Sequence, residues 1–273
     1  MNSKRILWTT TAAVLCCGAL TAAWADVPAK IELSNGNVID KCTLRWMPAS
    51  KKYAVTMGSA SGGQMEQQMS PSEISRKLVA PPAGWKELVG QVSKSPDAAL
   101  PKLMQIVESY KMLEYDEQAA YIAGTILLRK GRADEVIKLC EKVALDNPKA
   151  STVSVMAPVY WSALVATGKT AGGTLSKMLN EAVASAPRPV AAQALIVRGD
   201  MLKKEGRTAD ALKDGYLRCV FLFVQEKTAH AEALYKASLA FDELHQPTYA
   251  ERMRQTLLTD HKDSEFARKL RGN

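Results

Sequence analysis

The chain has 273 residues and carries 36 basic against 28 acidic side chains, which gives a formal net charge of +8. This positive excess is modest and spread along the sequence, without the basic stripe that a nucleic-acid-binding protein would show. The composition therefore excludes nucleic acid as the expected partner.

Residues 1–25 have the pattern of a secretory signal peptide. Lys4 and Arg5 form a basic start, residues 6–20 form an apolar run, and Ala-Trp-Ala at 23–25 places small residues at a cleavage site. The apolar run is shorter than the ~20 residues that span a bilayer, so we expect cleavage and not a retained anchor. Cleavage lowers the net charge to +6 and predicts a periplasmic or secreted bacterial protein, with peripheral attachment to membrane or cell wall left open.

Three cysteines remain in the mature chain, namely Cys42, Cys140 and Cys219. An odd number at wide spacing is not a disulfide framework, and no C-x-x-C pair is present for metal or redox chemistry. Cys140 and Cys219 stand among apolar residues of predicted helices, where cysteine usually behaves as a small buried side chain. The sequence leaves open whether any two of the three form a disulfide.

Residues 26–80 are predicted to form a small β module. Asn35 and Gly36 separate two alternating segments, which is a strong hairpin signal because both residues adopt positive φ readily. Five short strands in about fifty residues predict a small barrel that removes its open edges, and the layout resembles the SH3-like barrels of exported bacterial proteins. The expected strands are 30–33, 38–47, 53–57, 64–69 and 75–79.

Three aromatic residues near this module, Trp46, Tyr53 and Trp85, permit two interpretations. Trp46 and Tyr53 can lie opposite each other and fill the core, or the three can gather on one face to bind a peptide or a glycan. We favour the first interpretation. The sequence Pro-Pro-Ala-Gly at 81–84 then acts as a stiff linker, and residues 81–94 form a linker and leading helical segment.

The segment 95–273 contains a ladder of predicted helix pairs. Sharp turns recur near Gly131, Gly168, Gly206 and His245, at separations of 37, 38 and 39 residues. A period in this range indicates a repeat architecture, in which each unit stacks on its neighbours to bury its apolar face. We expect about four units.

Residues 117–148 form the clearest unit, with predicted helices at 117–130 and 133–145. This unit resembles the tetratricopeptide repeat family, whose fold is an αα-hairpin solenoid. The resemblance rests on the small, large apolar, turn, packing and closing positions, which are Gly124, Leu127, Gly131, Val136, Cys140, Val143 and Pro148. Glycine permits the tight turn, and proline stops the second helix.

The other units depart from the family pattern. Trp161 stands where a small residue is expected, and Pro158 either kinks the first helix of its unit or marks the true start. The third unit lacks the closing proline and ends in an unusually apolar run, 220–223. His245 replaces the usual turn glycine, and a short helix at 265–270 follows the last unit.

No catalytic motif accompanies these elements, and we expect neither an enzyme nor a bound metal or cofactor. His230, His245 and His261 are separated by 15 and 16 residues, whereas a helical metal pair needs residues three or four apart. Adjacent carboxylates, such as those at 116–117 and 242–243, are expected on helix surfaces.

In tetratricopeptide arrays the first helix of each unit lines a concave groove that holds peptides or helices. Two tyrosines with mixed charges suit a polypeptide partner, although Tyr121 and Tyr235 fit equally well as packing residues between units. Position by position, the resemblance implies partner contacts at Gln118, Tyr121, Thr125, Ser162, Asp200, Lys203, Tyr235 and Asp242.

The sequence therefore predicts a mainly α protein with a small β module, acting as a non-enzymatic scaffold or adaptor for protein partners in the cell envelope. Self-association remains open. The alternative is an accessory subunit, weak hydrolase or glycan-binding protein with a site at the junction of barrel and array.

Overall fold

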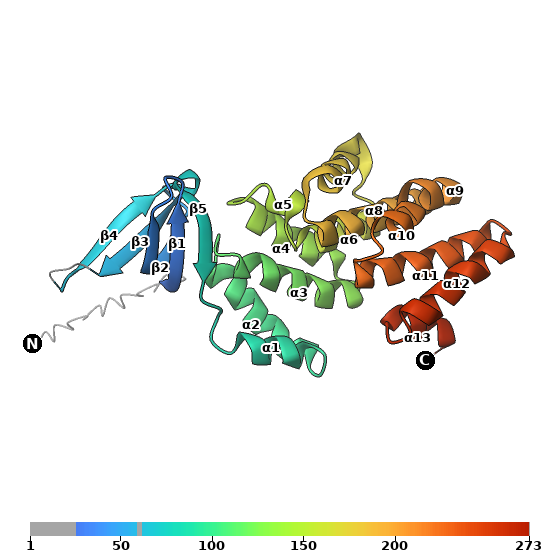
Figure 1. The fold of residues 1–273 in the computed structure, drawn as a ribbon, viewed down its shortest axis with the longest axis horizontal. Coiled ribbons are helices and arrows are strands. Elements are labelled where there is room, and N and C mark those ends of the chain that lie inside the picture. Colours follow the sequence, from blue (N-terminus) through green and yellow to red (C-terminus); the bar gives the residue numbers. More distant parts are fainter. Residues whose placement is uncertain (1–25, 59–61, 273) are drawn as a thin grey trace, which may run out of the picture.

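The computed structural model describes residues 26–58 and 62–272, so the predicted signal peptide lies outside the described residues. A small β-sheet stands at one end of an elongated row of helices (Figure 1). The strands form one antiparallel sheet in the order β4-β3-β2-β1-β5. Their bounds are β1 (Val27–Leu33), β2 (Val38–Met47), β3 (Lys52–Gly58), β4 (Gln64–Met69) and β5 (Ile74–Val79).

The prediction of a closed barrel is wrong, because the sheet is open. Among the described residues, β4 pairs only with β3 and β5 pairs only with β1, so both outer strands keep a free edge. The sequence of β4 explains this, since five of its six residues, Gln64–Gln68, are exposed and mostly polar. Closing the sheet around them would bury polar side chains without partners.

The core of the sheet is filled partly from outside the sheet. Trp46 and Tyr53 are cross-strand neighbours, both buried, with ring centroids 5.0 Å apart in an edge-to-face arrangement. This confirms the interpretation of the two aromatics as a core pair, while Trp85 packs against Tyr115 at 5.3 Å. Leu113, from the helical part of the chain, joins the same core and is only 1% exposed.

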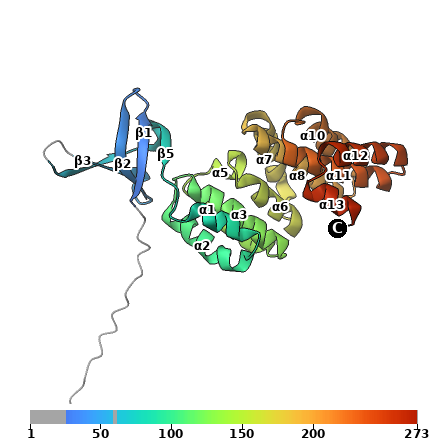
Figure 2. The ribbon, with the colours of Figure 1, turned by 60° about the horizontal axis from the view of Figure 1, so that its bottom comes forward.

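The helical part begins with α1 (Trp85–Val92) and α2 (Pro96–Ser109) and continues as a series of packed helices (Figures 1 and 2). Short 3₁₀ segments η1 (Pro71–Glu73) and η2 (Ala171–Gly173) precede β5 and α7. The remaining bounds are α3 (Tyr115–Arg129), α4 (Ala133–Ala144), α5 (Ala150–Val153), α6 (Ala157–Thr167), α7 (Thr174–Ser185), α8 (Arg188–Lys204), α9 (Thr208–Asp210), η3 (Ala211–Tyr216), α10 (Leu217–Leu222), α11 (Lys227–Glu243), α12 (Pro247–Asp260) and α13 (Glu265–Arg271).

The four predicted turns are confirmed, and they share one geometry. Gly131, Gly168, Gly206 and His245 all have left-handed backbone angles, with φ of 70°, 73°, 77° and 56°. The residue after each turn donates its N–H to the carbonyl five residues earlier, at 2.9–3.0 Å, as in a Schellman motif. Glycine suits this conformation best, and His245 adopts it at a small cost in strain.

The second unit, formed by α6 and α7, differs from the others at the position of Trp161 and in the packing of its second helix. Trp161 lies seven residues before its turn, where the other units have Gly124, Gly199 and Ser238. Its buried indole donates Nε1–H to the carbonyl of Ser151 in α5 at 2.8 Å. As a result α7 packs against α5 and α8, and Pro158 lies in the first turn of α6 and marks the start of that helix.

The second helix of the third unit contains a π-helical segment, η3, between α9 and α10. The spacing of its buried residues explains the distortion. Steps of four residues exceed the 3.6 residues of an α-helical turn, so a regular helix would rotate the buried stripe by about 40° at each step. The wider π turn keeps the stripe facing the array at Ala211, Leu212, Gly215, Tyr216, Cys219, Val220 and Phe223.

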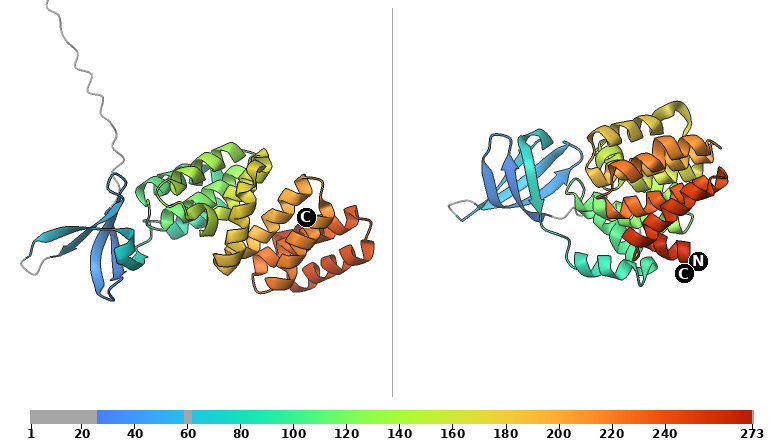
Figure 3. Two further views of the ribbon diagram at one scale, coloured as in Figure 1. Left: turned by 90° about the horizontal axis from the view of Figure 1, so that it is seen from above. Right: turned by 45° about the vertical axis from the view of Figure 1, so that its right-hand side comes forward.

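The first helices of the four units form a continuous row. α3 packs on α6, α6 on α8, and α8 on α11, while α2 packs at one end of the row and α13 at the other (Figure 3). Each helix therefore depends on its neighbours for burial, as a repeat array requires. None of the described helices is long and apolar enough to cross a membrane.

Candidate protein-binding surfaces

The eight residues predicted to line a groove lie on this row of first helices, at repeated positions relative to the turns. Tyr121 and Tyr235 each stand ten residues before a turn, and Lys203 and Asp242 stand three before one. Because equal positions of equal repeats point the same way, these residues belong to one face, called here the first-helix face. The remaining residues of this face are Gln118, which stands thirteen residues before a turn, and three residues that each stand six before one, namely Thr125, Ser162 and Asp200.

The two tyrosines of the first-helix face differ in their surroundings. Tyr121 is 40% exposed. Tyr235 is half-buried, with its ring 5.8 Å from that of Phe266 in α13. The C-terminal helix therefore covers part of this face at its far end, while the end near the sheet stays open. Thr125 serves its own helix, since its hydroxyl donates to the carbonyl of Tyr121 at 2.8 Å.

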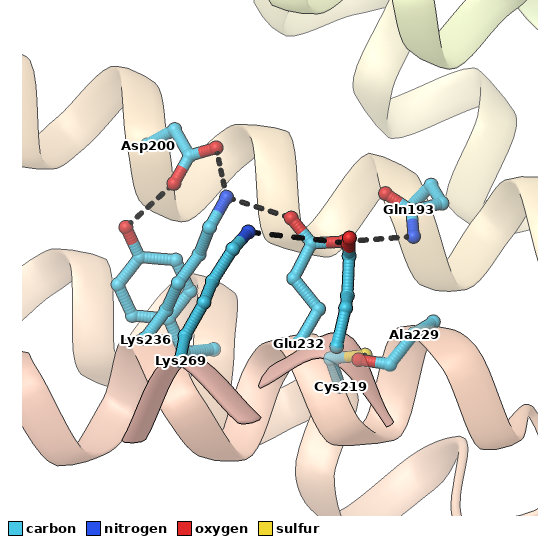
Figure 4. A network of polar contacts seen from close by, with 9 residues as sticks. Gln193, Asp200, Cys219, Ala229, Glu232, Lys236 and Lys269 are labelled. Atoms are coloured by element: carbon cyan, nitrogen blue, oxygen red, sulfur yellow. Dashed lines mark hydrogen bonds and ion pairs between the residues drawn. The ribbon is translucent and has the colours of Figure 1, made fainter. Parts of the chain in front are cut away.

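Asp200 belongs to a polar network that joins α8, η3 and α11 (Figure 4). It accepts a hydrogen bond from the Tyr216 hydroxyl at 2.8 Å and pairs with the Lys236 ammonium at 2.6 Å. Lys236 also pairs with Glu232 at 2.9 Å, which in turn accepts from the Gln193 amide at 3.2 Å. Both oxygens of Asp200 and both oxygens of Glu232 are engaged, so the network holds the third and fourth units in register.

The same network changes how its members titrate. Burial, followed by the nearby Asp200 carboxylate, raises the pKa of Tyr216 far above its usual value. Burial alone lowers the pKa of Lys236, but the carboxylates of Asp200 and Glu232 together outweigh it and raise the pKa. The Lys236 ammonium and the Tyr216 phenol therefore both keep their protons at neutral pH, and the role of the network is to stabilise the packing of the helices.

Two further residues of the first-helix face are also engaged within the chain. Lys203 pairs with Glu243 at 2.7 Å, and Asp242 pairs with Arg254 of α12. Gln118 and Tyr121, at the end of the face near the sheet, make no ion pair or side-chain hydrogen bond to another segment of the described chain.

An apolar cleft with a volume of about 530 Å³ lies between the second helix of the third unit and the end of α11. Phe221 and Leu222 on α10 are 70% and 55% exposed beside it. The residues that line it are Ala209, Leu212, Lys213, Leu217, Arg218, Phe221, Leu222, Phe241, Leu244 and Gln246. The sequence signal for this cleft was the apolar run 220–223, whose exposed half could not be identified without the tertiary structure.

A larger, more polar cavity of about 930 Å³ lies on the sheet, along β1 to β4 and the end of β5. Its carboxylates are largely neutralised within the sheet. Asp26 and Glu66 flank Arg45 at 3.3 and 3.2 Å, and Asp40 pairs with Lys30 at 2.5 Å. The cavity therefore presents no concentrated charge to a ligand.

The junction of sheet and array is a packed, hydrogen-bonded contact. The hydroxyl of Tyr53 donates to the carbonyl of Met112 at 2.9 Å and accepts from Lys77 at 3.0 Å. Asp116 is 3% exposed, contrary to the expectation of a surface carboxylate. Its Oδ2 accepts from the Met112 N–H at 2.8 Å, while its Oδ1 has no partner.

The burial of Asp116 perturbs its acidity strongly. Desolvation, followed by the charge of Glu117, raises the pKa of Asp116 to about 7, against the opposing hydrogen bond from Met112. Burial also raises the pKa of Glu117, whose carboxylate accepts from the Asn147 amide at 2.8 Å. The crevice beside Asp116 is too narrow to admit a water molecule.

The tertiary structure brings together two histidines that their spacing in the sequence separates. His230 near the start of α11 and His261 at the end of α12 are both buried, with Nδ1 of the first 2.7 Å from Nε2 of the second. Burial and the neighbouring imidazole lower the pKa of His230, and burial and Lys227 lower that of His261. Within the described part of the chain, no group of three or more potential ligands is arranged to hold a metal ion.

The three cysteines of the described chain are free and buried. Burial raises the pKa values of Cys140 and Cys219 to about 12 each, so both remain protonated thiols at neutral pH. They act as small apolar side chains in the cores of their units.

No known family model matches the chain, and no curated protein is similar to it in sequence. Among solved structures, the chain is similar to the Chs5-Chs6 exomer cargo adaptor complex bound to a portion of Chs3, with 10% sequence identity and a TM-score of 0.38. The match covers 83% of this chain and 41% of the other, so this chain spans about two fifths of that protein's length.

Proposed function

We propose that this protein is a non-enzymatic scaffold or adaptor that binds protein partners through its helical array, and that its helix pairs are tetratricopeptide-like repeats. The observation that carries the proposal is the continuous row of first helices, α3, α6, α8 and α11. A stacked array presents an extended surface at low cost, because its shape is already fixed before a partner binds.

The open part of the first-helix face is the contact region of this proposal. Tyr121 is exposed and flanked by Gln118 and Thr125, one helical turn to either side on α3. A tyrosine between amide and hydroxyl groups offers apolar area together with hydrogen bonds, which suits a polypeptide. Asp200, Lys203 and Asp242 shape the more distant part of the face through their ion pairs.

The proposal includes export to the cell envelope, on the basis of residues 1–25. Determination of the amino-terminal sequence of the protein from its native host tests this part. Export predicts a mature chain that begins at Asp26, whereas a chain retaining residues 1–25 and found in the cytoplasm would contradict it.

A hydrolase site at the junction of sheet and array has weaker physical support. Asp116 has the raised pKa of a general acid, but it lies in a crevice with no room for water, and its Oδ2 is engaged by a backbone N–H. Catalysis requires the acid within reach of a substrate. We therefore assign Asp116 to folding.

The test is a quantitative binding experiment with a partner isolated from an envelope extract and then purified. The variant Gln118→Ala/Tyr121→Ser/Thr125→Lys alters the open face, and Lys138→Glu on the exposed side of α4 is the matched control. We expect the triple variant to weaken binding at least tenfold and the control to bind normally. Equal binding by both variants would refute the assignment of the face, and the absence of any saturable protein partner would refute the scaffold.

A further inference from the structure

The segment that follows the π-helix is apolar on two sides, and only one side is covered. Cys219, Val220 and Phe223 are buried against the array. Phe221 and Leu222, on the opposite side, are 70% and 55% exposed. Large apolar side chains on both sides of a helix are normally buried on both sides, so the outer side of α10 lacks a covering element.

The exposed side forms one wall of the 530 Å³ cleft. α9, η3 and α10 make this wall, and Phe241 and Leu244 at the end of α11 contribute the other side. Tyr249 of α12 stacks on Phe241 with ring centroids 5.4 Å apart and extends the apolar surface. The wall from Ala209 to Leu222 is about 20 Å long at 1.5 Å per residue, which matches a partner helix of three to four turns.

The charged side chains that line the cleft are both cationic, Lys213 and Arg218. The ion pairs of this region join Lys203 to Glu243 and Arg207 to Asp210, and among the described residues none includes Lys213 or Arg218. Burial and then the charge of Arg218 lower the pKa of the neighbouring Arg198, while the carboxylate of Asp214 acts in the opposite direction. Asp214 is close to these arginines, but it does not line the cleft.

We propose that this cleft is a second docking site, which takes an amphipathic helix of a partner protein. The apolar face of that helix covers Phe221 and Leu222, and its glutamate or aspartate side chains meet Lys213 and Arg218. The proposal rests on the proposed function in that the ligand is a protein, but its site lies between the second helix of the third unit and the end of α11, and it leaves Gln118, Tyr121 and Thr125 of the first-helix face free.

The shape and charge of the cleft favour this occupant over two others. A bilayer surface is flat on this scale and would leave the side of the cleft at Phe241 and Leu244 uncovered. A symmetric pair of two copies would place the cationic rim of one chain against the same rim of the other, and like charges repel. An acidic amphipathic helix satisfies both the concave shape and the unpaired cations.

The test uses fluorescence anisotropy with the purified chain and two labelled 16-residue helical peptides. Both peptides carry leucines at i, i+3, i+4 and i+7, and they differ only in having glutamate or lysine beside the leucines. The chain is tested as wild type, as Phe221→Ser/Leu222→Ser and as Lys213→Glu/Arg218→Glu. The matched control is Leu145→Ser, which removes an apolar side chain that is 76% exposed at the end of α4.

We expect the glutamate peptide to bind at least tenfold more tightly than the lysine peptide at low salt. Phe221→Ser/Leu222→Ser should lower that affinity at least tenfold, Lys213→Glu/Arg218→Glu should reverse the peptide preference, and the control should bind as wild type. All the substituted side chains are exposed, and circular dichroism checks that each variant folds.

Several results would overturn the proposal. These are equal binding of the two peptides, no binding of the glutamate peptide, or no effect of the Phe221→Ser/Leu222→Ser change. Binding to phosphatidylglycerol vesicles that this change abolishes would identify a membrane-docking surface instead, and a dimer in sedimentation that it dissociates would identify self-association. The first-helix variant at Gln118, Tyr121 and Thr125 should bind the glutamate peptide normally, so failure of this proposal is distinguishable from failure of the scaffold function.

Discussion

The close contact between α8 and η3 allows a sharp test of the fold. Gly199 and Gly215 face each other across the two helices. A Cβ placed on Gly215 would lie 2.6 Å from the Cα and N atoms of Gly199 and 3.0 Å from the carbonyl oxygen of Leu195. These atoms are backbone atoms, so Gly215→Ala can be accommodated only if the two helices move apart.

The energetic cost follows from the size of the clash. Overpacking of a close contact costs about 1–3 kcal/mol. Separation of the helices also loosens the hydrogen bond from Tyr216 to Asp200, and a bond to a charged group contributes about 1.5–3 kcal/mol. The higher helix propensity of alanine offsets roughly 1 kcal/mol of this. We therefore expect Gly215→Ala to destabilise the protein by about 2–4 kcal/mol.

Gly90 provides a matched control, because it lies within α1 and a Cβ there would meet nothing within 4 Å. The chemically identical change Gly90→Ala should stabilise α1 by about 0.5–1 kcal/mol through helix propensity alone. Urea unfolding followed by circular dichroism measures both variants. Hydrogen exchange of the amides in α8 and α10 then localises the loss, since arrays of this kind need not unfold in one step.

The expected result is a difference of about 2.5–5 kcal/mol between the two variants, the sum of the two effects. It should be accompanied by faster exchange in α8 and α10 for Gly215→Ala only. If Gly215→Ala is as stable as Gly90→Ala, the reasoning is refuted, because the helices then do not cross at backbone contact.

Three further predictions concern the junction and the histidine pair. Leu113→Ala should destabilise the sheet by about 2–5 kcal/mol, because it leaves a cavity in the core of the sheet. Limited proteolysis of this variant should then cleave the strands before the helices. Resistance of the variant equal to that of the wild type would contradict the role of Leu113 in the core of the sheet. Folding raises the pKa of Asp116 from 3.8 to about 7, so the folded chain binds this proton more tightly than the unfolded chain. The contribution of Asp116 to the free energy of unfolding should therefore fall by roughly 4 kcal/mol as pH rises from 4 to 7. Urea unfolding across this range should show that Asp116→Asn removes the slope; an unchanged slope would contradict the assignment. Because the pKa values of His230 and His261 are lowered below their ordinary 6.5, the folded chain binds these protons less tightly, so stability should fall as pH drops below 6.5. His261→Gln should reduce this loss, whereas His245→Asn, at an exposed turn, should retain it, and equal profiles for the two would exclude the pair as the cause.

Features that depend on residues close together in the sequence could be predicted from the sequence. The turns at Gly131, Gly168, Gly206 and His245 were predictable because helix-ending residues and their spacing are local signals. The five strands and the pairing of Trp46 with Tyr53 follow from alternation and a hairpin turn, which set the register between adjacent strands.

Features that depend on contacts between distant segments could not be predicted in this way. The barrel prediction failed because closure depends on whether β4 has an apolar face to bury, and because Leu113 fills the core in place of a closing strand. The proximity of His230 and His261 arises from the packing of α11 on α12 and α13. The burial of Asp116 arises from the packing of α2 and α4 around the start of α3, which no local pattern reveals.

The candidate surfaces show the same division. The periodicity of the chain by itself indicated a row of stacked first helices, since regularly spaced turns place successive helix pairs side by side. Which of its residues are free was decided by long-range partners: α13 covers Tyr235, Lys236 engages Asp200, and Tyr121 stays open. The apolar cleft likewise depends on a π-helical segment that turns one apolar side of α10 inward and leaves Phe221 and Leu222 outside. Local hydrogen bonds set the elements, and burial against distant residues selects the surfaces on which a partner can bind.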